Sequence, residues 1–147
     1  MDAYKFNSLE EYVKNESRHY YNLSYRGIKN SEIKQFCESK GIKVKSRDKR
    51  NDMLDKLFET DEYVMEFYEE FKEYICVSFF DYSERFGISK SQYNQLKKAN
   101  FFEIDGYFEV KARYGWITVP ALSAKQFFNM TQEEINLALN NNQESLF

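Results

Sequence analysis

The chain has 147 residues, of which 42% are hydrophobic and 18% aromatic, so it can bury one compact core, and its single proline and five glycines exclude a low-complexity linker. With one histidine and two cysteines, it cannot assemble a metal site of several histidines within one chain. No apolar run approaches the roughly 20 residues that span a bilayer, and the N-terminus lacks the pattern of a secretion signal, so we expect a cytoplasmic protein with no membrane partner.

The formal net charge of −3 hides an uneven distribution of charge. Residues 40–50 carry six basic side chains and one acid, and residues 85–99 carry four basic side chains and no acid. Between them, residues 55–84 carry ten acids and two bases. Because salt screens charges over roughly 8 Å, each basic stretch can attract a polyanion locally despite the negative total. We therefore expect two basic sites divided by an acidic segment.

The N-terminal part of the chain contains the signatures of three helices. A capping box begins the first helix at Ser8. The second begins at Asn30 or Ser31 and ends at Gly41, a residue able to adopt the positive φ of a helix C-terminus. The third begins near Asp48. The first basic stretch therefore forms the loop between the second and third helices.

Residues 30–57, NSEIKQFCESKGIKVKSRDKRNDMLDKL, resemble the helix–extended loop–helix of SAP-type DNA-binding modules. The matching positions are apolar residues of both helices, the KGI at their junction and a basic pair: Ile33, Phe36, Lys40, Gly41, Ile42, Lys49, Arg50, Met53, Leu54 and Leu57. The resemblance implies phosphate contacts by the basic residues of the loop and of the start of the second helix: Lys43, Lys45, Arg47, Lys49 and Arg50. The loop is longer than is usual in the family and lacks its glycine. The alternative is a solvated basic loop on a helical hairpin.

A fourth helix is expected from Asp61, because apolar residues recur at helical spacing as far as Ile75 and acids occupy or flank the opposite face. These acids also define an alternative interface. An acidic helix can imitate nucleic acid and bind a host protein. The residues of this alternative protein interface are Glu62, Glu66, Glu69 and Glu73.

Residues 79–102, FFDYSERFGISKSQYNQLKKANFF, have the spacing of a helix-turn-helix. Gly87 lies at the turn, Ser89 begins a capping box for the second helix, and Tyr93 and Leu96 face inward. The opposite face carries side chains that can hydrogen-bond base edges or phosphates: Lys90, Ser91, Gln92, Asn94, Gln95 and Lys98. The alternative is a helical corner with no role in nucleic-acid binding.

The next segment, FFEIDGYFEV, alternates around Asp105-Gly106, which predicts a two-residue hairpin turn, and RYGWITV predicts a further strand. A hairpin after the second helix would make a winged version of the helix-turn-helix. Lys111 and Arg113 would lie on this wing and reach phosphate. We expect Trp116 in the core or packed against the acidic helix.

The predicted fold class is α+β and mostly α. A SAP-like helical module with its basic loop occupies residues 1–59, and an acidic connecting helix occupies residues 60–77. A winged helix-turn-helix with a short β-hairpin and two last short helices occupies residues 78–139. The asparagine-rich tail, residues 140–147, is expected to fray.

Catalysis finds little support in the sequence. Cys37 and Cys76 lie 39 residues apart, without metal-ligand spacing, and both fall in apolar patterns, so we expect reduced, buried thiols. His19 is expected to be a packed surface residue, and the acids of residues 62–73 have the spacing of a solvated face. No glycine-rich phosphate loop occurs. We expect that the protein is not an enzyme and that it binds no metal and no cofactor.

The predicted function is non-catalytic nucleic-acid binding, with duplex DNA as the partner, by a small regulator or replication accessory. The Lys-, Asn- and Tyr-rich composition resembles that of phage and mobile-element proteins of low-GC Gram-positive bacteria. The rival prediction is an inhibitor of a host nuclease or defence complex, similar to anti-CRISPR proteins. A homodimer and an assembly role for exposed aromatic residues stay open.

Overall fold

The computed structural model describes residues 4–19 and 27–144. The described residues form eight helices and one three-stranded antiparallel sheet, which confirms the predicted α+β, mostly α class. The elements are α1 Leu9–Glu16, α2 Asn30–Ser39, α3 Arg50–Leu57, α4 Asp61–Phe71, β1 Cys76–Val77, α5 Phe79–Phe86, α6 Lys90–Lys98, β2 Ile104–Ala112, β3 Gly115–Ser123, α7 Ala124–Asn129 and α8 Gln132–Glu144. Among these helices, none is long and apolar enough to cross a bilayer.

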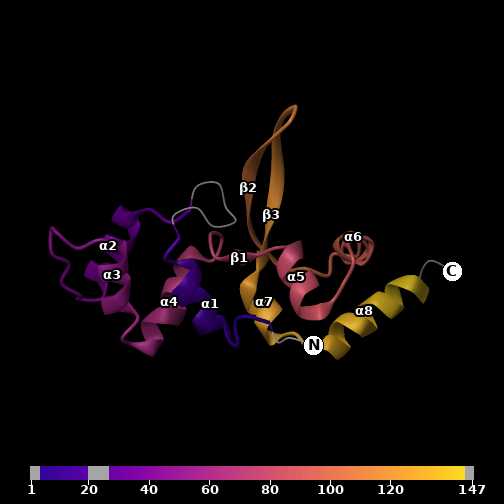
Figure 1. Cartoon of the computed structure of the whole chain (residues 1–147), viewed down its shortest axis with the longest axis horizontal. Helices are drawn as coiled ribbons and strands as arrows, with labels where there is room; N and C mark the ends of the chain where they lie inside the picture. Colours follow the sequence, from indigo (N-terminus) through magenta and orange to yellow (C-terminus); the bar gives the residue numbers. More distant parts are fainter. Residues whose placement is uncertain (1–3, 20–26, 145–147) are drawn as a thin grey trace.

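Figure 1 shows an elongated molecule. Helices α2 and α3 lie at one end, α6 and α8 lie at the other, and the β2–β3 hairpin projects from the middle. The two basic stretches therefore occupy opposite ends of the long axis.

Several helices begin where local capping predicts. The Ser8 hydroxyl accepts from the Glu11 amide at 3.2 Å to begin α1, and the Ser89 hydroxyl accepts from the Gln92 amide at 3.1 Å to begin α6. Gly87, which joins α5 to α6, has a φ of 70°, a left-handed conformation that costs glycine little. Helix α5 therefore ends, and α6 begins, at the residues that the sequence predicts.

One hydrophobic core runs through both ends of the chain. It includes the buried side chains of Val64, Phe67 and Tyr68 of α4. The Tyr12 hydroxyl of α1 donates to the Cys76 carbonyl of β1 at 2.6 Å, and the Tyr4 hydroxyl donates to Asp81 of α5 at 2.7 Å. The N-terminal segment therefore packs on the C-terminal elements.

Both cysteines are buried free thiols, as the apolar patterns predict. Burial raises the pKa of the Cys76 thiol to about 12, because the thiolate would lose its hydration. Burial also raises the pKa of Cys37. Both groups therefore stay protonated near neutral pH.

The sheet corrects the predicted hairpin. Strands occur in the order β1-β3-β2, and β2 runs through Asp105-Gly106 without turning. The turn lies at Arg113-Tyr114, because Ala112 pairs with Gly115. Gly106 instead allows the backbone of β2 to pack closely against Glu73, because a Cβ at position 106 would lie 3.0 Å from the Cβ of Glu73. The glycine that suggested a turn therefore lets β2 pass the chain that leaves α4.

Trp116 is also placed differently from the prediction. It lies on β3 opposite Lys111, with 52% of its surface exposed, and not in the core. The reason is the projection of the hairpin, since only the inner residues of β3, 121–123, are buried.

Two helix ends differ from the predicted ones. Helix α4 ends at Phe71, and the following turn rather than the helix carries the buried Ile75. Helix α8 continues to Glu144, through residues that were expected to fray, and residues 145–147 lie outside the described part.

Candidate nucleic-acid interface

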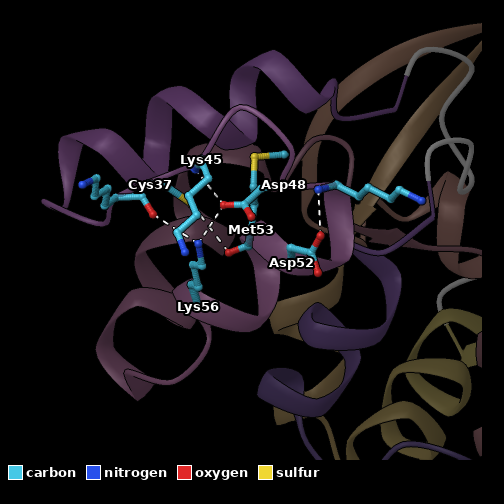
Figure 2. Close-up of polar contacts among 8 residues, drawn as sticks. Cys37, Lys45, Asp48, Asp52, Met53 and Lys56 are labelled. Atoms are coloured by element: carbon cyan, nitrogen blue, oxygen red, sulfur yellow. Dashed lines mark hydrogen bonds and ion pairs between the residues drawn. The ribbon is translucent and has the colours of Figure 1, made fainter.

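One aspartate shapes the first basic stretch. Asp48 Oδ2 accepts a hydrogen bond from the Lys45 amide at 2.8 Å and lies 2.7 Å from Lys56 Nζ of α3 (Figure 2). Lys56 Nζ also donates to the Lys43 carbonyl at 3.3 Å. The hydrogen bond from Lys56, followed by that from the Lys45 amide, holds the pKa of the Asp48 carboxyl below its usual value. The loop is therefore folded back onto α3.

The helices beneath this loop pack through apolar side chains. Met53 of α3 is buried, and its carbonyl lies 3.7 Å from Cys37 Sγ of α2 (Figure 2). The Lys49 amide donates to the Asp52 carboxylate at 2.9 Å, which begins α3. These contacts leave four basic side chains of the loop exposed: Lys43, Lys45, Arg47 and Lys49.

Arg50 is placed differently from the other four. Its guanidinium donates to the carbonyls of Ser17 at 2.9 Å and Ile28 at 2.7 Å, and to Asn30 Oδ1 at 2.9 Å. It therefore joins the end of α1 to the start of α2. Lys40 also makes an internal contact, because its Nζ lies 2.6 Å from Glu66 of α4. These two cations hold the framework of the N-terminal end.

The second basic stretch presents one exposed face of α6. Five residues lie on it: Lys90, Ser91, Asn94, Lys97 and Lys98. Tyr93 and Leu96 are buried on the opposite side, as predicted. Lys97 was not among the predicted site residues, although helical spacing places it one turn after Asn94 on the same face.

Two predicted contact residues of α6 already have partners within the protein. The Gln92 Oε1 accepts from the Ser89 amide at 2.9 Å, in the capping box. The Gln95 Nε2 donates to the Leu139 carbonyl of α8 at 3.0 Å. Both side chains are half-buried. The docking of α8 on α6 covers this side of the helix, and no local sequence pattern indicates that contact.

Aromatic rings surround the start of α6. Lys90 Nζ lies 4.7 Å from the ring centroid of Phe79 and 4.9 Å from that of Tyr93, within the range of a cation–π interaction. Arg85 of α5 is used internally, since its guanidinium donates to the carbonyls of Phe127 and Met130. Arg85 therefore hydrogen-bonds within the protein, whereas the lysines of α6 are exposed to solvent.

The hairpin carries exposed basic and aromatic side chains together. Lys111 and Arg113 are exposed, and the Arg113 guanidinium lies 5.4 Å from the ring centroid of Tyr114. Tyr114, in the turn, is 92% exposed. The hairpin thus offers cations at a distance from the body of the protein.

The acids of α4 and of the turn that follows it face solvent, but some of them form ion pairs. Glu62, Glu66, Glu69 and Glu73 are all exposed. Glu66 pairs with Lys40, and Glu69 lies 3.5 Å from Lys72 and 3.9 Å from Lys125. These ion pairs reduce the negative potential of the surface.

Within residues 4–19 and 27–144, no group of three or more histidine, cysteine, aspartate or glutamate side chains could hold a metal ion.

A cavity of about 590 Å³ lies beside α4 and is lined by both acids and lysines, including Glu69, Lys72 and Asp105. Burial raises the pKa of the Asp105 carboxyl above its usual value. His19 is exposed just after α1.

Comparison with protein-family models, with curated protein sequences and with solved structures gives no match to this chain. Its function is therefore inferred from its residues and their geometry.

Proposed function

We propose that the protein binds duplex DNA, without catalysing a reaction, through a winged helix-turn-helix made of α5, α6 and the β2–β3 hairpin. One observation carries this proposal. The outward face of α6 combines three lysines with Ser91 and Asn94, and the inward face of the same helix is buried. Cations and small polar groups on a rigid helix can fix the position of DNA through its phosphates and reach base edges.

The proposed contact set differs from the predicted one. Gln92 and Gln95 are left out, because their side chains already hydrogen-bond within the protein. Lys97 is added, and Lys111 and Arg113 of the hairpin supply further phosphate contacts. With the two glutamines engaged, Asn94 and Ser91 are the polar residues left on α6 to read bases, so phosphate contacts dominate the affinity.

The loop between α2 and α3 supplies a second contact in this proposal. Four of its basic side chains are exposed, while Arg50 is engaged with backbone carbonyls. The loop and α6 lie at opposite ends of the molecule (Figure 1), so a duplex would have to lie along the long axis to contact both. Such a protein would suit a regulator or replication accessory of a phage or mobile element.

The test is a titration of random duplex DNA at several salt concentrations, read by fluorescence anisotropy. The triple variant K90Q/K97Q/K98Q should bind more weakly and flatten the slope of log affinity against log salt by about 3. A control, K29Q/K34Q/K125Q, makes the same change of charge at exposed lysines elsewhere. Equal affinity and slope for the two variants would overturn the proposal.

A second candidate function rests on α4. Its exposed Glu62, Glu66, Glu69 and the following Glu73 could bind a nucleic-acid-binding protein of the host as a mimic of phosphates. Replacing these four acids by glutamine should abolish capture of a host protein in a pull-down. The fold should stay intact, because the ion pairs of Glu66 and Glu69 are solvent-accessible and contribute little to stability. If the original protein captures no partner, this candidate fails.

A further inference from the structure

An aromatic groove lies between the helix-turn-helix and the inner half of the hairpin. Its volume is about 290 Å³, just below the roughly 300–1,000 Å³ typical of small-ligand sites. Its walls include Phe79 and Phe80 of α5, Tyr93 of α6, and Phe108 and Val119 of the hairpin. Lys90 is the only charged residue among the described residues that line it.

The rings of the groove form a continuous surface that ends in solvent. The ring centroids of Phe79 and Tyr93 lie 5.2 Å apart, and those of Phe79 and Phe80 lie 5.6 Å apart. Phe80 is 77% exposed, so one ring has an uncovered face. The Lys90 ammonium lies above the two inner rings, where it remains exposed.

We infer that this groove binds an unpaired nucleobase of the DNA that contacts α6, with the base stacked on Phe80 and the adjoining phosphate paired with Lys90. This inference rests on the proposed DNA binding and adds a preference for unpaired nucleotides. Apolar aromatic walls with one cation and no lining anion match a ligand that is flat and negatively charged. A nucleotide is such a ligand, because its base has a π-face and its sugar carries a negatively charged phosphate.

The position of Lys90 connects the groove to the proposed duplex contact. The same side chain lines the groove and lies on the exposed face of α6. A base within a duplex cannot enter unless it leaves the stack, which costs a few kcal/mol and costs least for a mismatched or unpaired base. The groove therefore favours DNA that contains a bulge or another unpaired nucleotide.

The test compares a blunt duplex with the same duplex carrying one bulged thymidine, at one salt concentration. The wild-type protein should prefer the bulged duplex by about 5- to 150-fold, the range that corresponds to base–aromatic stacking. Phe80→Ala should lose most of this preference and keep the affinity for the blunt duplex. Phe80→Trp should retain the preference, as should Leu137→Ala, a control that removes an exposed apolar side chain from α8.

The outcomes separate this inference from the proposed function. Binding of neither DNA overturns both. Equal affinity of the wild-type protein for the two duplexes, or full preference in the Phe80→Ala variant, overturns only the inference about the groove. Sedimentation of the free protein is measured in parallel. If Phe80→Ala abolishes self-association and leaves the DNA preference intact, the groove binds a second copy of the chain and the inference is wrong.

Discussion

The first basic stretch carries its exposed cations on a loop, whereas the second carries them on a capped helix. The loop is folded onto α3 by Asp48 and Lys56, and it contains no helix or strand that would space its side chains regularly. On α6, the spacing of the exposed residues is that of the helix, and the buried Tyr93 and Leu96 hold it in place. A loop can adapt to phosphates, while a rigid helix can also keep a polar side chain aimed at a base edge.

Each region also uses one arginine for its own framework. Arg50 donates to carbonyls that follow α1 and precede α2, and Arg85 donates to carbonyls around the α7–α8 junction. The planar guanidinium, with its five donors, suits several backbone acceptors at once, whereas exposed lysines act as hydrated point charges. Charge counts along the chain therefore overstate the cations left for a ligand.

The largest expected effect is on the salt dependence of DNA binding, and it tests whether the exposed cations of the loop contact phosphates. The variant K43Q/K45Q/R47Q/K49Q should flatten the slope of log affinity against log salt by about 4, because each phosphate contact contributes roughly 0.9. The loss should be similar for all DNA sequences. The measurement is a salt series with a random and a selected duplex. An unchanged slope would make the loop a solubility feature.

The next effect is on stability, and it distinguishes Arg50, which hydrogen-bonds within the protein, from the exposed Arg47 of the same basic stretch. Arg50→Ala should lower the free energy of unfolding, because the buried carbonyls of Ser17 and Ile28 each lose a donor, at about 1–3 kcal/mol apiece. The exposed Arg47→Ala should change stability by less than about 0.5 kcal/mol. Urea unfolding of both variants measures this. Equal stability would show that the Arg50 hydrogen bonds contribute nothing net.

A smaller effect separates two polar residues of α6. Asn94→Ala should reduce the preference for a selected site by about 1–3 kcal/mol and barely change binding to random DNA, because an amide can make a bidentate contact with a base. Gln95→Ala should instead weaken the docking of α8, since its hydrogen bond to Leu139 is lost. Selection from a random duplex library, followed by both variants, tests this. Loss of preference only in Gln95→Ala would reverse the assignment.

The smallest effect concerns the pH dependence of the loop. The folded-state pKa of Asp48 is depressed, so its contribution to stability is fully present above its ordinary pKa of about 3.9 and is lost as the pH falls through the lower folded value. Asp48→Asn should therefore be less stable than the original protein near neutral pH, and the gap should close in acid. Urea unfolding at several pH values measures it, and a gap independent of pH would contradict the role of the carboxylate.

The sequence by itself determined the local features of this protein. Helix starts at Ser8 and Ser89, the turn at Gly87, and the burial of Tyr93 and Leu96 all follow from capping chemistry and helical period, which act within a few residues. The sequence marks Asp48 as the single acid of the basic stretch and as the approximate start of the third helix, and its spacing to Lys45 also allows the turn that it closes in the structure.

Only the tertiary structure decided which side chains were left for a ligand. Asp105-Gly106 has the composition of a turn, yet the approach of Glu73 explains the glycine and the chain turns at Arg113-Tyr114. Trp116 is exposed because the hairpin projects from the body. The docking of α8 engages Gln95, which lies 44 residues before its partner Leu139 in the chain. Such contacts join segments far apart in sequence, and no period or motif within one segment can specify them.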